Sequence, residues 1–411
     1  MKKRIIYICT IIILILANCT AYVFADDADE EELLENEVKE ISVETIAEEQ
    51  KEPVLNARAA VIYDRKTKEI IWGKNENEKK AMASTTKIMT AIVVLEKGNL
   101  SDVVTISKKA ANTGGSRLKI NTNDKISVLD LLYGLMLRSG NDAAVALAEY
   151  VGGSIEGFAK LMNKKAIEIG LKNTHFVTPH GLDNIEHYTT AYELAVLTDY
   201  AMQNEKFSKI VNTKNTTISI NGVARNIYNT NELLGTLNGV NGVKTGFTNN
   251  AGRCLVTSCT RNGNQIITVV LGCDAKKYRT SDSIKLIEYA FKNYTRVNIE
   301  EKVKIEFEKW KQINGKRIYI SKGEKSDVNL ELKEITKKEI PVKIGEENNI
   351  QVEINAIYEY EAPLEKQSKI GNILIKKDEE IIESVDIVCL ERIEKKNTLT
   401  YLKELIVAIF L

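Results

Sequence analysis

Apolar residues follow two different periods along this chain of 411 residues, and the period changes near residue 297. Before that point, apolar positions recur every three to four residues in several segments, which predicts amphipathic helices between short strands. After that point, they alternate with lysine and glutamate, which predicts half-buried antiparallel strands. A chain of this length can bury two or three separate cores. We therefore expect two folded domains, over residues 53–296 and 297–393.

The first domain is predicted to belong to the α/β class. Strand patterns at 59–64 and 69–72 precede a block of helices, and the strand patterns at 252–260 and 265–273 follow it. Because strands stand at both ends of this segment, we expect one sheet that both ends build together. The helices are expected at residues 84–97, 128–138, 142–151, 155–169, 191–203 and 281–294.

The second domain is predicted to be a small β-sandwich over residues 297–393. We find no helix of note and no cluster of reactive side chains in this segment. It is therefore interpreted as a spacer or docking module and not as a catalytic domain. Its strands are indicated by four alternating runs: Val303, Ile305 and Phe307; Ile318 and Ile320; Val328, Leu330 and Leu332; Val352, Ile354 and Ala356.

The N-terminus has the pattern of a secretory signal peptide over residues 1–25. Basic residues at 2–4 precede an apolar run at 5–16, and Val23 and Ala25 are small residues before a cleavage site after Ala25. An uncleaved membrane helix is the alternative, but the run is shorter than the ~20 residues that a span needs. Residues 26–52 are crowded with acidic residues, which predicts a disordered or loosely helical spacer.

The C-terminal residues 394–411 are predicted to form an amphipathic helix. The segment is too short to span a bilayer, but it could lie in the membrane interface with its apolar face inward. A helix packed on its own domain is the alternative. The apolar positions that recur with helical spacing are Leu399, Leu402, Leu405, Ile406, Ile409 and Phe410.

Composition excludes several other classes of protein. The 57 basic and 57 acidic residues balance, which argues against nucleic acid as the main partner. Six cysteines in this length do not make a disulfide scaffold, and none has zinc-site spacing. His175, His180 and His187 also lack metal-ligand spacing, so we expect them to be structural and expect no metal or other cofactor. Cys254, Cys259 and Cys273 are expected to be small core residues.

The first motif with a chemical meaning is Ser84-x-x-Lys87, at the start of an apolar helix. A spacing of three places the hydroxyl and the amine on one helix face, so the amine can reach the serine proton. A serine needs a base to become a nucleophile, and a lysine among apolar neighbours can act as that base. Ser116-x-x-Lys119 has the same spacing in a loop, so the motif alone also fits a helix cap with an exposed lysine.

Two further motifs follow along the chain. Ser139-Gly140-Asn141 lies in a turn between predicted helices, where the hydroxyl could relay a proton and the amide could hold a substrate carbonyl. Lys244-Thr245-Gly246 lies on a predicted strand, where the lysine and the hydroxyl could bind a carboxylate and the glycine leaves room for a substrate backbone. Taken singly, a helix cap and a strand end explain these residues. The ordered set of all three motifs in one α/β segment favours catalysis.

With these motifs, residues 53–393 resemble the low-molecular-mass penicillin-binding proteins that are serine-type D-alanyl-D-alanine carboxypeptidases. The resemblance implies a β-lactamase/transpeptidase-like fold, with an antiparallel sheet, helices on both faces and a helical subdomain, followed by a small all-β domain. Arg253 departs from it, because an aromatic residue is expected there. The segments that carry the resemblance also include Ala59–Asp64, Gly114–Leu118, Ser139–Ala144, Met162–Asn163, Asn173–Phe176, Pro179–Asp183, His187–Ala191, Gly242–Gly246 and Asn250–Gly252.

The resemblance also implies a role for each site residue. Ser84 would attack the carbonyl between the two terminal D-alanines of a peptidoglycan stem pentapeptide, with Lys87 as the base. Ser139 and Asn141 would help pass the proton to the departing D-alanine and hold the acyl chain. β-Lactam antibiotics would acylate the same serine. The implied carboxylate site is Lys244, Thr245, Gly246 and Arg279, and the implied oxyanion hole is the backbone N–H groups of Ser84 and Phe247.

The location and the rival functions complete these expectations. The resemblance implies an exported protein, held at the outer face of the cytoplasmic membrane by the C-terminal helix. A serine β-lactamase is the nearest rival, but no convincing Glu-x-x-x-Asn loop lies between the second and third motifs. A catalytically silent wall-binding or β-lactam-sensing protein is a second rival. A purely structural surface protein is a third, and it would require all three motifs to be coincidences.

Overall fold

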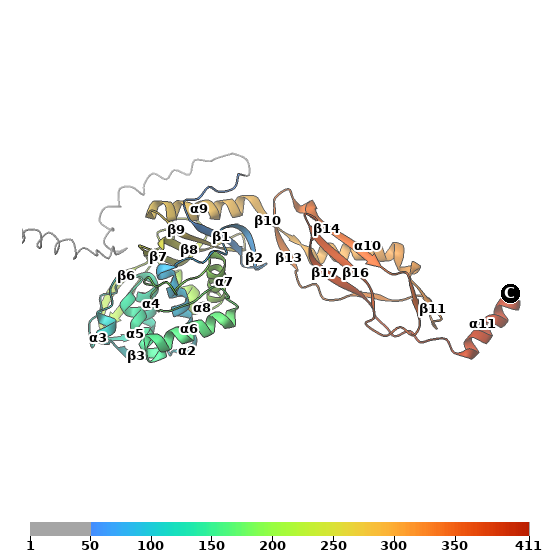
Figure 1. Cartoon of the computed structure of the whole chain (residues 1–411), viewed down its shortest axis with the longest axis horizontal. Helices are drawn as coiled ribbons and strands as arrows, with labels where there is room; N and C mark the ends of the chain where they lie inside the picture. The colour runs from blue at the N-terminus through green and yellow to red at the C-terminus, as the bar shows by residue number, and fades with distance from the viewer. Residues whose placement is uncertain (1–50, 411) are drawn as a thin grey trace, which may run out of the picture. The chain divides into compact units, whose positions relative to one another are not determined.

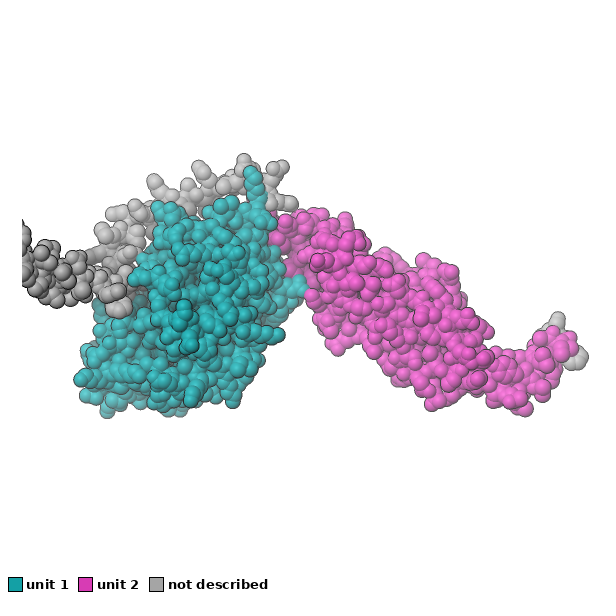
Figure 2. Space-filling model, in the orientation of Figure 1, with its two compact units in different colours: residues 1–290 teal, residues 291–411 magenta. Residues whose placement is uncertain are grey.

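The computed structural model describes residues 51–410, so the predicted signal peptide and nearly all of the acidic spacer lie outside the described residues. The chain divides into two compact units, of which the first ends at Ala290 and the second begins at Phe291 (Figure 2). Each unit has its own hydrophobic core, and the two cores share no residue. Each unit is therefore a folded body with its own apolar interior.

A five-stranded antiparallel sheet forms the centre of the first unit, with the strand order β2-β1-β9-β8-β7 (Figure 1). Strand β1 pairs with β9, from Ala59 opposite Leu271 to Asp64 opposite Ile266. The two ends of the segment therefore build one sheet, as the sequence predicts. The strands are β1 (Ala59–Asp64), β2 (Glu69–Lys74), β7 (Val240–Thr248), β8 (Gly252–Arg261) and β9 (Asn264–Cys273).

Helices cover both faces of this sheet (Figure 1). Helix α9 (Lys276–Asn293) lies along one face, and α7 (Ala191–Met202) packs on β1 and β9 from the other. Helix α9 begins five residues before the predicted start at Ser281. The other elements are the helices α2 (Lys87–Lys97), α3 (Lys108–Ala111), α4 (Val128–Leu137), α5 (Asn141–Gly152), α6 (Ile155–Ile169) and α8 (Glu205–Val211), and the strand pairs β3 (Val103–Thr105) with β4 (Lys125–Ser127) and β5 (Asn215–Ile220) with β6 (Val223–Tyr228).

Helix α2 occupies the middle of the helical group. Its first eight residues, Lys87 to Val94, are all buried. It contacts α4, α5, α6, α7 and α8. A helix that is enclosed on every side needs apolar residues on every side, and α2 has them except at its polar start. The lysine of the first motif therefore lies at the buried start of a helix that other helices surround.

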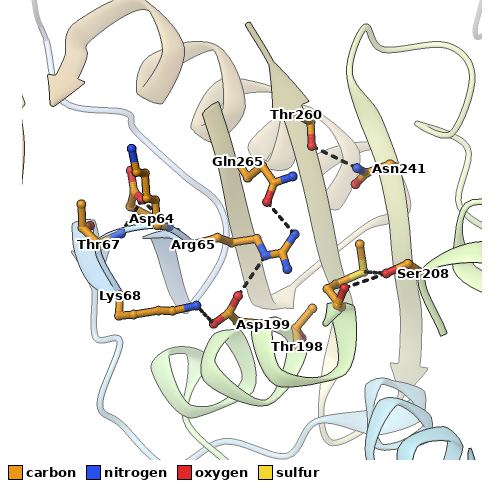
Figure 3. A network of polar contacts seen from close by, with 12 residues as sticks. Asp64, Arg65, Thr67, Lys68, Thr198, Asp199, Ser208, Asn241, Thr260 and Gln265 are labelled. Atoms are coloured by element: carbon orange, nitrogen blue, oxygen red, sulfur yellow. Dashed lines mark hydrogen bonds and ion pairs between the residues drawn. The ribbon is translucent and has the colours of Figure 1, made fainter. Parts of the chain in front are cut away.

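An ion-pair network around the buried Asp199 joins the turn between β1 and β2 to α7 (Figure 3). The carboxylate of Asp199 accepts hydrogen bonds from Arg65 Nε at 2.9 Å and from Lys68 Nζ at 2.5 Å. Arg65 also donates to the side chain of Gln265 on β9 at 3.1 Å. Within the turn, Asp64 accepts from the backbone N–H groups of residues 66 and 67. The network fixes this end of the sheet against α7.

The second unit is built mainly of strands. A four-stranded sheet has the order β12-β17-β16-β14, and two pairs of strands, β10 with β13 and β11 with β15, lie beside it. The predicted strands at 318–320, 328–332 and 352–356 are present in part or in full. The strands are β10 (Tyr294–Asn298), β11 (Tyr319–Ser321), β12 (Leu330–Leu332), β13 (Glu339–Lys343), β14 (Ile350–Ala356), β15 (Glu359–Glu361), β16 (Lys369–Lys377) and β17 (Glu380–Cys389).

The strand predicted from Val303, Ile305 and Phe307 is wrong, because these residues lie in helix α10 (Ile299–Asn314). Residues 299, 303 and 307 are spaced by four and are buried together, whereas Ile305 is 49% exposed on the other side. The helix starts at Asn298, whose side chain accepts a hydrogen bond from the N–H of Glu301. Residues 303, 305 and 307 fit the two-residue period of a strand, but residues 299, 303 and 307 fit the four-residue spacing of a helix, and the helix is what forms.

The C-terminal helix α11 (Thr398–Phe410) is present where the sequence predicts it. Its apolar residues are exposed, with Leu399 at 64% and Ile409 at 68% of their full accessibility. The alternative in which this helix packs on its own domain therefore finds no support. Within residues 51–410, no helix has both the length and the apolar character needed to cross a membrane.

Candidate active site

Ser84 and Lys87 lie in contact at the start of α2. Ser84 belongs to a short 3-10 turn, Ala83–Thr86, that leads directly into the helix at Lys87. Lys87 is fully buried, and its Nζ donates to Ser84 Oγ at 2.7 Å, to Asn141 Oδ1 at 2.7 Å and to the carbonyl of His180 at 3.0 Å. All three acceptors are neutral groups. These three hydrogen bonds hold the amine against the serine hydroxyl.

The second motif forms the turn between α4 and α5. Asn141 is the first residue of α5, and its amide nitrogen donates to the carbonyl of Gly114 at 2.7 Å while its Oδ1 faces Lys87. Ser139 is buried in the same turn. Its hydroxyl makes no hydrogen bond within residues 51–410, so its expected role as a proton relay rests on position alone. The structure thus links Asn141 to Lys87 directly, and it does not link Ser139.

The third motif lies on β7, against the turn that carries Ser84. A Cβ atom on Gly246 would lie 3.1 Å from Ser84 N and 3.2 Å from Ala83 Cβ. Glycine therefore lets the strand approach the nucleophile more closely than a side chain would allow. Lys244 is buried, and its Nζ donates to the carbonyl of Thr245 at 2.9 Å. The Thr245 hydroxyl lies 2.8 Å from the hydroxyl of Thr230.

A hollow of about 230 Å³ opens in front of Ser84. Its polar wall includes Asn141, and Leu182 and Phe247 supply apolar surface. Asp183 joins two of the walls, because its carboxylate accepts from Thr248 Oγ1 at 2.6 Å and from the N–H of Asn250 at 3.3 Å. Sequence reasoning assigned no role to Asp183. The hollow combines apolar surface with a few polar groups, as ligand-binding pockets do.

Arg253, which departs from the family pattern, lies opposite Phe247 on the neighbouring strand. Its guanidinium carbon is 3.8 Å from the centre of the Phe247 ring. A guanidinium on an aromatic face is a favourable cation–π contact. The guanidinium of Arg253 therefore packs against the ring of Phe247, which is part of the apolar wall of the hollow.

The histidines have structural contacts, as the sequence predicts. His187 Nδ1 accepts from the N–H of Val177 at 2.9 Å, so Nε2 is the nitrogen that carries hydrogen and contacts Thr86 Oγ1 at 2.8 Å. Burial, and then the charge of His175, lowers the pKa of His187 to about 4. Burial, followed by Lys87 and His187, lowers the pKa of His180 to about 3. Both rings are therefore neutral at neutral pH. The His187 ring helps to hold the turn around Ser84, and the His180 ring accepts from the N–H of Leu182 at 3.2 Å.

The three predicted core cysteines and the predicted carboxylate-binding arginine lie outside the cluster of Ser84, Lys87 and Asn141. Cys254, Cys259 and Cys273 are buried, and burial raises the pKa of the Cys259 thiol to about 11. Within the described residues, no three His, Cys, Asp or Glu side chains lie close enough to hold a metal ion. Arg279 is 2% exposed on α9, and its Nη2 lies 3.6 Å from Glu232 Oε1. Glu232 belongs to none of the three motifs, and only its position opposite Arg279 brings it to the site.

Comparison with known proteins now identifies the family. Residues 45–275 match the family model of D-alanyl-D-alanine carboxypeptidase, and residues 296–395 match the model of the penicillin-binding protein 5 C-terminal domain. D-alanyl-D-alanine carboxypeptidase DacF of Bacillus subtilis is 34% identical over 84% of this chain and 88% of its own length. The chain therefore belongs to the D-alanyl-D-alanine carboxypeptidase family and is a low-molecular-mass penicillin-binding protein.

Solved structures agree with this assignment. The D-alanyl-D-alanine carboxypeptidase DacD of Francisella tularensis has a TM-score of 0.69 and 28% identity, and the match covers 86% of this chain and 98% of that one. The Streptomyces K15 DD-transpeptidase has a TM-score of 0.57 and 36% identity, over 59% of this chain and 99% of that one. The α/β fold and the strand-rich second domain are thus those that the resemblance implied.

Proposed function

We propose that this protein removes the terminal D-alanine from peptidoglycan stem pentapeptides through an acyl-enzyme on Ser84. The observation that carries the proposal is the contact of the buried Lys87 amine with Ser84 Oγ at 2.7 Å, at the edge of a hollow that Ser84 lines. A half-buried serine paired with a buried lysine beside a glycine-edged strand is suited to acyl transfer, because the nucleophile, the base and a strand edge for the substrate lie together.

The proposed first step is attack of Ser84 Oγ on the carbonyl carbon between the two terminal D-alanines. Lys87, in its neutral form and with its lone pair toward Ser84, takes the hydroxyl proton and becomes an ammonium, and the backbone N–H groups of Ser84 and Phe247 bind the oxyanion. The bond to the terminal D-alanine breaks, and its nitrogen takes a proton with the help of Ser139 and Asn141. Water then attacks the ester and frees the serine. Loss of one oxyanion donor typically lowers kcat by ~10²–10³-fold.

We assign binding of the substrate carboxylate to Lys244, Thr245 and Arg279, with Gly246 leaving room for the peptide backbone beside β7. Lys244 and Arg279 are both cationic and almost fully buried, at 1% and 2% exposure. A buried cation gains most from an anionic partner, because little water competes for it. The carboxylate of a β-lactam would bind in the same way while its ring opens onto Ser84.

We further propose that residues 53–296 are the catalytic domain, that 297–393 serve as a stalk, and that residues 1–25 direct export and are removed. Helix α11 would hold the protein at the outer face of the cytoplasmic membrane. The support is its row of exposed apolar side chains, which have no partner protein surface in the second unit. Deletion of residues 394–411 should release the protein from sedimenting anionic lipid vesicles, whereas full-length protein should co-sediment.

The test of function is intact-mass spectrometry of residues 53–393 with excess benzylpenicillin, sampled from seconds to hours. A penicilloyl adduct that persists, and that is absent in Ser84→Ala, is the expected result, followed by release of D-alanine from a pentapeptide. An adduct that disappears within seconds would indicate a β-lactamase instead. Absence of any adduct would contradict the assignment of Ser84 and favour a silent binding protein.

A further inference from the structure

Three consecutive residues, Thr230, Asn231 and Glu232, each contact a different part of the proposed site. The backbone N–H of Thr230 donates to the carbonyl of Leu137 at the end of α4, and its hydroxyl meets that of Thr245. Asn231 Nδ2 donates to the carbonyl of Gly242 on β7 at 3.0 Å. Glu232 faces Arg279 on α9. The segment is thus built into the side of the site that would bind a carboxylate.

Arg279 is a buried cation, and one nitrogen of its guanidinium group lacks a hydrogen-bond partner within the described residues. Its side chain is 2% exposed, and its Nε has no hydrogen-bond partner within the described residues. A buried guanidinium is costly unless a carboxylate balances its charge. Glu232, at 3.6 Å from Nη2, supplies that charge but is too far away for a hydrogen bond.

Glu232 is held in place by other groups. Its carboxylate lies 3.1 Å from Lys276 Nζ, and it accepts a hydrogen bond from the hydroxyl of Thr280. Burial acts to raise the pKa of Glu232, but Arg279, Thr280 and Lys276 together hold it below its ordinary value. The carboxylate is therefore a fixed negative charge beside Arg279, whose buried Nε has no hydrogen-bond partner within the described residues.

We propose that Glu232 weakens the affinity of Arg279 for carboxylates, so that D-alanine leaves the site soon after it is cut from the substrate. The inference rests on the proposed function. A released D-alanine that stayed bound could attack the ester with its amine, re-form the peptide bond and return the proton to Ser84. Repulsion between its carboxylate and Glu232 favours departure, which leaves the ester to water. Glu232 is in this sense a specificity-determining residue that favours hydrolysis over the reverse reaction.

The test compares the wild-type protein with Glu232→Gln, which removes the charge and keeps the shape. The KM for a peptide ending in D-Ala-D-Ala should fall, and inhibition by added D-alanine should strengthen, each by about 3- to 10-fold, as expected for one partly exposed charge pair. Inhibition by D-alaninamide, which has no carboxylate, should be the same in both proteins. Glu232→Asp, which keeps the charge, should behave like the wild type.

Glu288→Gln is the matched control, because Glu288 also pairs with an arginine, Arg261 at 2.6 Å, but on the exposed part of α9. It should change neither KM nor D-alanine inhibition. An unchanged or higher KM in Glu232→Gln would overturn the inference, and Glu232→Ala provides the same comparison if Glu232→Gln does not fold. Failure of the wild-type protein to release D-alanine would instead overturn the proposed function.

Discussion

The two units of this protein differ in whether they bury polar and charged side chains. Among the described residues, every buried polar or charged side chain lies between Asp64 and Ser283, within the first unit. The second unit has a core of apolar residues and Cys389. Its ion pairs are on the surface, as for Lys369 and Asp386, whose side chains are 57% and 31% exposed.

Among the described residues, this difference places the buried charged groups, which are suited to chemistry, in the first unit alone. Burying a charge costs free energy unless a partner and hydrogen bonds compensate it, so a fold retains such groups where it uses them. The first unit buries Lys87, Lys244 and Arg279 and surrounds each with polar groups. The second unit needs only its apolar core to fold. Substitutions should therefore act far more strongly in the first unit than in the second.

The largest effect is expected from Lys87→Ala. Loss of the amine leaves Ser84 without a base, and acylation by benzylpenicillin should slow by about 10³-fold or more. Stopped-flow or mass-spectrometric acylation rates measure this. Lys119→Ala removes the lysine of the other Ser-x-x-Lys sequence and should leave the rate unchanged. A rate near that of the wild type in Lys87→Ala would contradict the proposed role of the lysine.

The next effect is on stability and concerns the network of Asp199 in Figure 3. Its carboxylate is 6% exposed and balances Arg65 and Lys68. Asp199→Ala leaves the guanidinium of Arg65, which is 11% exposed, without its carboxylate partner, which should cost about 3 kcal/mol of unfolding free energy. The chain has two tryptophans, Trp72 in the first unit and Trp310 in the second. Single-tryptophan variants therefore report on each unit separately.

When urea unfolding is followed by tryptophan fluorescence, Asp199→Ala should shift only the unfolding transition that Trp72 reports. Equal movement of the transition seen by Trp310 would show that the two units unfold together. It would then remove the basis for comparing them as separate bodies. The variants Trp72→Phe and Trp310→Phe without the aspartate change provide the reference curves.

A smaller effect should appear with pH, again in the first unit only. His187 has a folded pKa of about 4, below the ordinary value near 6.5, because its ring is buried. The unfolded chain takes up a proton in this window and the folded protein does not. Stability is therefore complete above about pH 6.5 and declines toward pH 4, by roughly 1 kcal/mol per pH unit for each such histidine. His187→Gln should reduce this slope, measured by urea unfolding between pH 6.5 and 5.

The smallest effect is expected at the surface of the second unit. Lys369 lowers the pKa of Asp386 from 2.6 Å away, but both side chains are largely in water. Asp386→Ala should therefore change the unfolding free energy by no more than about 1 kcal/mol. A loss as large as that of Asp199→Ala would refute the contrast between the two units.

Much of this architecture was predictable because local patterns agree with the final fold. The Ser84, Asn141 and Lys244 motifs, the helices of the first unit and the pairing of its two ends all follow from short sequence segments. The strand predicted at Val303 to Phe307 failed because one pattern fitted two periods. Asn298 followed by Glu301 is a helix-start signal that would have favoured the helix.

The sequence by itself determined which side chains could do chemistry and which segments could be helix or strand. Those properties depend on residues a few positions apart. Only the tertiary structure decided that Glu232 faces Arg279, that His187 supports the Thr86 turn and that Asp183 joins the two walls of the hollow. Such contacts join residues that lie 47 to 101 positions apart. No local periodicity carries that information, because it depends on how whole elements pack.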